Sequence, residues 1–322
     1  MANQKDVSKI SDHDLRPTSW TDYIGQDMIK KNLLILLEAA SSRSVSPDHI
    51  LLYGQPGLGK TTLANLIAKH LGTNLIQTTG PVIEKASDLT STLSSLSAGD
   101  VLFIDEIHRL PKSVEEILYP AMESGTLDIM VGKGPSARTV HIELQPFTLI
   151  GATTRLSELS SPLRSRFSGG IFKLEPYTTD ELSQILMRTA QMLQLPHDHE
   201  VLQHIAKRSR RTPRTANYYL RRVGDLAHIR GINITEDIIN EALTMLGISE
   251  EGLTLVDQEY IRAVRDKFSG GPVGVKTIAA SIGEESRTVE DVIEPYLLYE
   301  GIIEKTSSGR KLTTRGYGFN IK

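Results

Sequence analysis

The first residues in this sequence that could do chemistry form a glycine-rich loop. Segment 51–63 reads LLYGQPGLGKTTL, and it fits the phosphate-loop pattern G-x-x-x-x-G-K-[ST] at Gly54, Gly59, Lys60 and Thr61. Glycines let a backbone wrap closely round a phosphate, and the N–H groups that open a helix point at an anion. Lys60 would neutralise the β/γ-phosphates of a nucleoside triphosphate, and the Thr61 hydroxyl would ligate Mg²⁺.

The segments on either side of this loop support the same chemistry. Ile50–Tyr53 is a short apolar run that is typical of a buried strand, and Leu63–Leu71 has the apolar spacing of a helix. Strand, glycine loop and helix is the order that phosphate binding needs. The alternative, a glycine turn before a surface helix, does not explain why the spacing and both flanks agree.

A carboxylate pair follows the next strongly apolar run. Val101–Ile104 is continuously apolar, as in strands that are covered on both faces of a parallel sheet, and Asp105 and Glu106 come directly after it. After a phosphate loop, this pattern predicts a Walker B element. Asp105 would hold Mg²⁺ directly or through water, and Glu106 would polarise the attacking water. The alternative is an acidic helix cap.

A third buried strand is predicted at Phe147–Gly151, and polar residues follow it. Thr154 near its end could hydrogen-bond the γ-phosphate or the attacking water. The segment SPLRSRF then supplies Arg164 and Arg166. An arginine across a subunit interface can stabilise charge on a transferring phosphoryl group, but a surface arginine more commonly forms a salt bridge. The spacing alone leaves both roles open.

Composition narrows the class of protein. The formal net charge of -3 argues against a generally basic nucleic-acid coat, although one domain could still carry a basic patch. The chain has no cysteine, which excludes disulfides, thiol catalysis and cysteine-ligated zinc. The N-terminus lacks the apolar core of a secretory signal, and no apolar run approaches the ~18 residues of a membrane span. We therefore expect a cytoplasmic protein.

The elements that must position these groups suggest three domains. Residues 1–176 predict an α/β ATPase domain with a parallel sheet, and 177–247 are almost wholly helical in pattern, with Thr179 and Thr235 as helix N-caps. Residues 250–322 read as three helices and a terminal hairpin, the order of a winged-helix domain.

The last hairpin is the expected wing. Its strands are predicted at Ile302–Lys305 and Lys311–Thr314, with Ser307–Arg310 as the tip, and Arg310 and Arg315 make it basic. Contact with DNA phosphates is the function that this charge favours. The acidic residues of the expected recognition helix, which would repel phosphate, are Glu290, Asp291 and Glu294. We therefore expect DNA contact mainly through the wing, with little reading of bases.

Two further features leave alternatives open. Leu127–Val131 and Thr139–Leu144 predict a hairpin with GKGPSA at its tip, which could belong to the core or could offer an apolar contact to a partner. Arg214 follows Pro213 at a predicted helix start within a basic cluster. It could lie on a solvated face, or it could reach a nucleotide phosphate from the second domain.

Taken together, several blocks resemble the bacterial RuvB family, the Holliday-junction branch-migration ATPases of the AAA+ class. These blocks are GQPGLGKTTLA, DEIHRL, YPAME…LDIMVGKGP, GATTR, SPLRSRF, TPRTAN and GRKLTTRG, and they run over nearly the whole chain. The resemblance implies a homohexameric ring that uses ATP to move duplex DNA at Holliday junctions in recombination and repair. It also implies RuvA as a partner docked on the 127–144 hairpin, and RuvC in the resolving complex.

The resemblance implies a role for each matching residue. The ATP or ADP contacts are Leu15, Arg16, Gly57, Leu58, Gly59, Lys60, Thr61, Thr62, Tyr177 and Arg214, with Glu123, Ser124 and Gly125 where a neighbouring subunit approaches. The catalytic residues are Lys60, Asp105, Glu106, Thr154 and Arg166, the last acting as an arginine finger on the neighbour's nucleotide. Thr61 and Asp105 would hold Mg²⁺, and Arg310 and Arg315 would contact DNA.

Two other functions remain open from the sequence. A clamp-loader or initiator-like AAA+ switch would bind DNA without processive motion, and a protein-remodelling AAA+ subunit would not need DNA. Processing of a four-way junction with and without RuvA separates the first from a motor, and DNA-stimulated ATP hydrolysis separates the second. The chain also reads GQPG where the family usually has GPPG. Gln55 should be tolerated, since Gly54 and Gly57 keep the backbone path.

Overall fold

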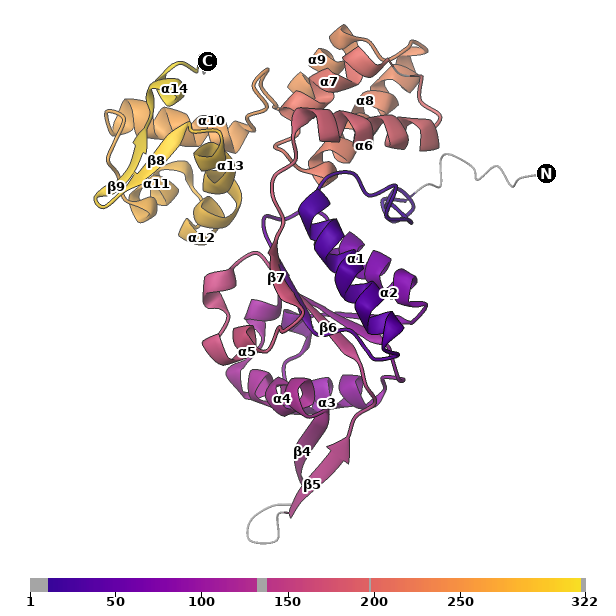
Figure 1. The fold of residues 1–322 in the computed structure, drawn as a ribbon. Helices are drawn as coiled ribbons and strands as arrows, with labels where there is room; N and C mark the ends of the chain where they lie inside the picture. The colour runs from indigo at the N-terminus through magenta and orange to yellow at the C-terminus, as the bar shows by residue number, and fades with distance from the viewer. Residues whose placement is uncertain (1–10, 132–137, 197, 320–322) are drawn as a thin grey trace, which may run out of the picture. The chain divides into compact units, whose positions relative to one another are not determined.

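The computed structural model describes residues 11–131, 138–196 and 198–319. The chain forms two compact units, Met1–Tyr177 and Thr178–Lys322 (Figure 1). Among the described residues, no helix is both long and apolar enough to cross a lipid bilayer.

The first unit is built on a five-stranded sheet in which every neighbouring pair of strands is parallel. The strand order is β2-β3-β6-β1-β7, which confirms the predicted α/β class. The strands are β1 (Ile50–Tyr53), β2 (Leu75–Thr79), β3 (Val101–Asp105), β6 (Thr148–Thr153) and β7 (Gly170–Lys173). The sequence did not predict β7, an edge strand whose side chains are all at least partly exposed.

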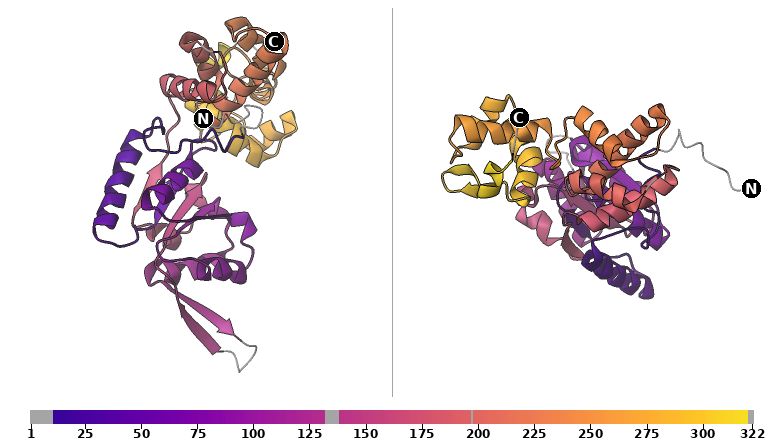
Figure 2. Two further views of the ribbon diagram at one scale, coloured as in Figure 1. Left: turned by 90° about the vertical axis from the view of Figure 1, so that its right-hand side faces the viewer. Right: turned by 90° about the horizontal axis from the view of Figure 1, so that it is seen from above.

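Helices cover both faces of this sheet (Figures 1 and 2). They are α1 (Asp27–Ser42), α2 (Lys60–Leu71), α3 (Ala86–Ser94), α4 (Lys112–Glu123) and α5 (Ser161–Ser165). On one face α2 packs on the sheet and α1 packs on α2, while α3, α4 and α5 contribute to the core on the other face. Coverage on both faces explains the continuous apolar runs of the central strands.

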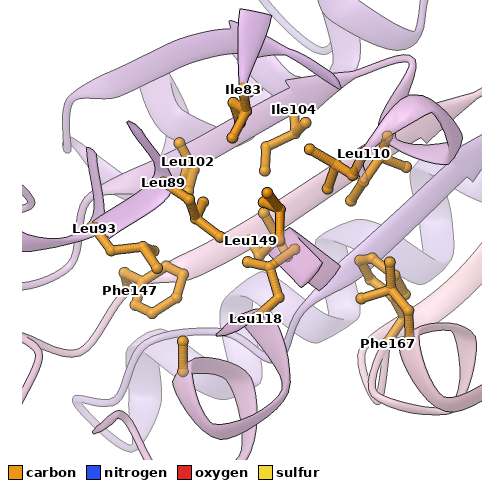
Figure 3. Packing of buried hydrophobic residues seen from close by; sticks show 14 of the residues in the cluster. Ile83, Leu89, Leu93, Leu102, Ile104, Leu110, Leu118, Phe147, Leu149 and Phe167 are labelled. Carbon is orange, nitrogen blue, oxygen red and sulfur yellow. The ribbon is translucent and has the colours of Figure 1, made fainter. Parts of the chain in front are cut away.

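The core on the α3–α4 face holds the central strands in place. Leu102 and Ile104 of β3 and Leu149 of β6 are fully buried there, against Leu89 of α3 and Leu118 of α4 (Figure 3). A closely packed interior tolerates little change in side-chain volume, so the strand ends that follow these residues are held firmly.

A two-stranded hairpin leaves the end of α4. It consists of β4 (Thr126–Val131) and β5 (Arg138–Glu143), which pair antiparallel, as predicted (Figure 1). The predicted tip, GKGPSA at 132–137, lies outside the described residues. Leu127 at the base is buried in the core, whereas Val140 further out is 43% exposed. The base therefore belongs to the core, and the outer part offers an apolar side chain to solvent.

The second unit begins with four helices, as the sequence predicted. They are α6 (Thr179–Met192), α7 (His199–Arg208), α8 (Pro213–Arg230) and α9 (Glu236–Met245). Thr235 is the N-cap of α9, but the predicted cap at Thr179 is wrong. Thr178 caps α6 instead, because its hydroxyl accepts the Glu181 amide while the Glu181 carboxylate accepts the Thr178 amide.

The rest of the second unit has the predicted helices and terminal hairpin, followed by a short helix, α14, that the sequence did not predict. They are α10 (Leu255–Arg262), α11 (Val275–Ile282), α12 (Ser286–Thr288), α13 (Glu294–Tyr299), β8 (Ile303–Thr306), β9 (Gly309–Leu312) and α14 (Thr314–Tyr317). The predicted tip at Ser307–Arg310 is too long. Arg310 lies within β9, where it pairs with Lys305 of β8 and, on its other side, with Val273.

Candidate functional site

The phosphate loop has a backbone that only glycine adopts easily. Gly54, Gly57 and Gly59 have φ angles of 146°, 83° and 103°. A Cβ atom on Gly54 would lie 2.7 Å from the Leu174 carbonyl oxygen, and one on Gly59 would lie 2.8 Å from the Tyr23 hydroxyl. Leu174 and Tyr23 thus pack against the loop, and α2 begins at its end, at Lys60, where helix N–H groups can meet an anion.

Lys60 lies across this loop. Its Nζ donates to the carbonyl oxygens of Gly54 at 2.7 Å and Gln55 at 3.0 Å, and only 7% of the residue is exposed. Charged donors form their stronger hydrogen bonds with charged acceptors, so phosphate oxygens would compete well for this ammonium group. Leu58 and Thr62 are buried beside it, and Thr61 is half-buried.

The sheet order brings the Walker B and sensor residues to the loop. β6 lies between β3 and β1, so the carboxyl ends of these three strands adjoin. The Gly54 amide donates to the Thr153 carbonyl at 3.2 Å, which joins the loop directly to the end of β6. Asp105 ends β3, and Thr154 follows the end of β6. Lys60, Asp105 and Thr154 therefore lie at the same edge of the sheet. In open α/β sheets, small molecules bind at this edge, outside the carboxyl ends of the strands.

Glu106 follows Asp105 in an uncommon conformation. Its φ of 49° and ψ of 41° lie in the left-handed region, which is rare for residues other than glycine and asparagine. Its amide donates to Asp105 Oδ1 at 2.9 Å. Two residues that the sequence analysis missed lie nearby: His108, whose Nε2 is 3.4 Å from Glu106 Oε2, and Thr153, whose hydroxyl is 2.9 Å from His108 Nδ1. The histidine of the block DEIHRL was the available signal for the first of them.

The N-terminal segment packs on the loop from the opposite side. Leu15 is buried, Arg16 is half-buried, and the Tyr177 hydroxyl donates to the Leu58 carbonyl at 3.3 Å. Burial raises the pKa of Tyr23 well above its ordinary value, and the neighbouring Tyr177 raises it further. Tyr23 and Tyr177 thus lie against the loop, at Gly59 and Leu58, while a nucleotide contact by Leu15, Arg16 or Tyr177 stays a prediction.

Arg166 is held among residues of α4 and α5. Its guanidinium donates to the Pro162 carbonyl at 2.7 Å, lies 4.5 Å from the centre of the Tyr119 ring, and pairs with Glu123 at 3.1 Å. Glu123 ends α4, and Ser124 and Gly125 follow it. Arg166 and the segment 123–125 were predicted as two independent parts of the site. The pair between Arg166 and Glu123 joins them into one cluster.

Thr61 and Asp105 are the residues that could hold Mg²⁺. No group of three or more His, Asp or Glu side chains with the geometry of a metal cage occurs in the described parts of the chain. Mg²⁺ is usually bound through one or two carboxylates together with substrate phosphates and water, and Asp105 is such a carboxylate.

Arg214 lies in the second unit, as the second residue of α8, and it is exposed. The helix start that the sequence predicted is confirmed, with Pro213 at its first position and Thr212 as its N-cap. A nucleotide contact by Arg214 stays a prediction.

The two predicted DNA-contact residues differ in environment. Arg310 is 14% exposed and donates to Glu294 at 2.7 and 3.1 Å and to Glu290 at 2.9 Å, and the bonds to Glu294 raise its pKa. Arg315 is 59% exposed and pairs with Glu300 at 2.9 Å. The expectation that Glu294 repels DNA is wrong, because its side chain is fully buried and also pairs with Lys305. DNA contact by Arg310 would have to replace its carboxylate partners.

Three family descriptions match consecutive parts of the chain. The Holliday junction DNA helicase RuvB P-loop domain matches residues 15–173, the RuvB AAA lid domain 177–249 and the RuvB C-terminal winged helix domain 250–320. A structure described as the Thermotoga maritima RuvB Holliday junction branch migration motor is 45% identical over 94% of this chain and 97% of its own, with a TM-score of 0.86. Two substituted variants of Thermotoga maritima RuvB, also 45% identical over the same shares, have TM-scores of 0.86 and 0.87.

Removal of the Lys60 ammonium group should weaken nucleotide binding. We expect Lys60→Ala to lower ADP affinity by about tenfold or more, since a hydrogen bond to a charged group contributes roughly 1.5–3 kcal/mol. The matched control is Lys69→Ala, near the other end of α2, where the lysine donates to the Thr18 carbonyl. Calorimetric titration with ADP measures both. Equal affinities for the two variants would remove Lys60 from the site.

Proposed function

The chain belongs to the RuvB family of Holliday junction branch-migration motors and is a P-loop ATPase; we propose that it works as a homohexameric ring on duplex DNA and binds Mg²⁺ with its nucleotide. The nucleotide and Mg²⁺ part of the proposal is supported by one observation: the phosphate loop, Asp105 and Thr154 meet at one edge of the sheet. We further propose the division into an ATPase domain (1–176), a lid (177–247) and a winged-helix domain (250–322).

The nucleotide is proposed to bind with its phosphates in the loop. Backbone amides from 57 to 62 cradle the phosphates, and Lys60 turns from the Gly54 and Gln55 carbonyls to the β/γ-phosphate oxygens. Thr61 and Asp105 hold Mg²⁺, which neutralises charge that develops on the phosphates. Glu106 orients the attacking water, and Thr154 donates to the γ-phosphate or to that water.

The remaining contacts are proposed to come from the flanks of the site. Leu15, Arg16 and Tyr177 border the nucleotide within the first unit, and Arg214 reaches it from the lid.

Arg166 is proposed to act on the nucleotide of a neighbouring subunit. Its partner Glu123 ends α4, and the two form one cluster with Ser124 and Gly125. In a ring, this cluster would meet the adjacent phosphate loop, and hydrolysis at each site would need two subunits. Such dependence lets a ring pass conformational changes from one subunit to the next.

Partners are proposed for two surfaces outside the nucleotide site, the 127–144 hairpin and the winged-helix region. RuvA would dock on the outer part of the 127–144 hairpin, where Val140 is exposed. RuvC would join in the resolving complex. DNA backbone contact without reading of sequence would come chiefly from Arg315, which lies on α14 directly after the wing and is 59% exposed, because Arg310 in the wing is 14% exposed and already paired with buried Glu294. A DNA substrate of this kind favours a location in the bacterial cytoplasm.

Mixed rings test the proposed role of Arg166. Arg166→Ala alone should lose most ATP turnover, by on the order of 10³-fold, the lower end of the effect of an arginine finger. It should regain part of its turnover when mixed with Lys60→Ala, because an Arg166→Ala site next to a Lys60→Ala subunit receives an intact arginine. Arg164→Ala, two residues away on α5, is the matched control and should keep its turnover. Mixtures as inactive as both parents would contradict action between subunits.

Removal of the Arg315 charge tests the proposed DNA contact. Arg315→Ala should weaken binding to duplexes of any sequence about equally and reduce the slope of log affinity against log salt by about 1, the share of one phosphate contact. Arg287→Ala is the control, since it removes one charge from α12 of the same unit. Fluorescence anisotropy at several salt concentrations gives both quantities. An unchanged affinity and slope would exclude Arg315 from the DNA path.

A further inference from the structure

His108 joins the end of the sensor strand to the Walker B glutamate. Its side chain is 2% exposed and lies in the short turn Ile107–Arg109 that follows β3. His108 Nδ1 is 2.9 Å from the Thr153 hydroxyl, and Nε2 is 3.4 Å from Glu106 Oε2. One buried imidazole therefore contacts both the last residue of β6 and the side chain proposed to orient water.

The surrounding groups favour one arrangement of protons. Two carboxylates face Nε2, Glu106 at 3.4 Å and Glu158 at 3.8 Å, so a proton on Nε2 is favoured in the neutral ring. Nδ1 is then an acceptor, and the Thr153 hydroxyl donates to it. The same hydroxyl accepts the Arg155 amide at 2.9 Å. Donation thus runs from Arg155 through Thr153 to His108, whose Nε2 faces the Glu106 carboxylate at 3.4 Å.

This series of hydrogen bonds begins beside Thr154, the residue that is expected to contact the γ-phosphate. Thr153 and Arg155 flank Thr154 in the sequence, and the Thr153 carbonyl accepts the Gly54 amide of the phosphate loop. A displacement of Thr154 would therefore move both hydrogen-bond partners that lead to His108. At the other end, Glu106 has a left-handed backbone, a strained conformation of the kind that clusters at functional sites and persists where surrounding contacts hold it.

We propose that His108 is a positioning residue that fixes the Glu106 carboxylate according to the state of the sensor strand. It does not touch the nucleotide in this scheme. Glu158 offers a second acceptor for Nε2–H, so the imidazole can release Glu106 by turning to Glu158 when β6 shifts. The inference rests on the proposed role of Glu106.

The test separates orientation of water from nucleotide binding. His108→Ala should lower kcat about ten- to a hundredfold, part of the roughly 10²–10⁴-fold that a positioned base contributes, with KM for ATP and ADP affinity unchanged. His108→Gln keeps one donor and one acceptor and should recover part of the loss. Thr153→Val, which keeps the shape but removes the hydroxyl, should lower kcat in the same way. His70→Ala on α2, which also removes an imidazole, should leave kcat unchanged.

A double-mutant cycle distinguishes this role from general loss of structure. Glu106→Gln combined with His108→Ala should turn over no more slowly than Glu106→Gln alone, since His108 acts through Glu106. Three outcomes would overturn the inference while leaving the role of Glu106 intact. They are losses of kcat that multiply in the double variant, a loss in His108→Ala confined to KM or ADP affinity, and full kcat in His108→Ala. Full kcat in Glu106→Gln would instead overturn the proposed role of Glu106, and the inference with it.

Discussion

The phosphate loop is held in place by the strand beside it, through the hydrogen bond from the Gly54 amide to the Thr153 carbonyl. Because β6 lies between β1 and β3, this bond also sets the distance from the loop to Asp105 and Glu106. The apolar core under β3 and β6 leaves these strand ends little freedom. The proposed contacts to nucleotide, Mg²⁺ and water thus depend on one register in one sheet.

In the proposed ring, each nucleotide site would be completed by a neighbouring subunit. Arg166 is paired with Glu123 and stacked on Tyr119, so it is presented together with the segment that ends α4. The proposal assigns this cluster to a second copy of the site, which is why the ring is central to it. The RuvB family to which the chain belongs is a family of branch-migration motors, in agreement with this requirement.

The local motifs could be predicted because their chemistry is local. The phosphate loop, the buried strand before Asp105 and the hairpin were all found from spacing and periodicity. The capping box of Thr178 and Glu181 could have been predicted in the same way, from spacing, and was overlooked.

The features that could not be predicted depend on contacts between residues far apart in the sequence. β7 is a short edge strand, and the position of Arg310 in β9 depends on pairing with Val273, 37 residues away (310 − 273). The burial of Glu294 depends on partners in the wing.

The central claim is that hydrolysis at the loop moves a DNA junction rather than only switching a bound state. The direct measurement is the rate of ATP-driven branch migration on a synthetic four-way junction with RuvA present, with ATP turnover followed in the same reaction. We predict migration that needs ATP and RuvA together and is lost when ADP replaces ATP. Junction-stimulated turnover without any migration would contradict the motor and favour a nucleotide switch.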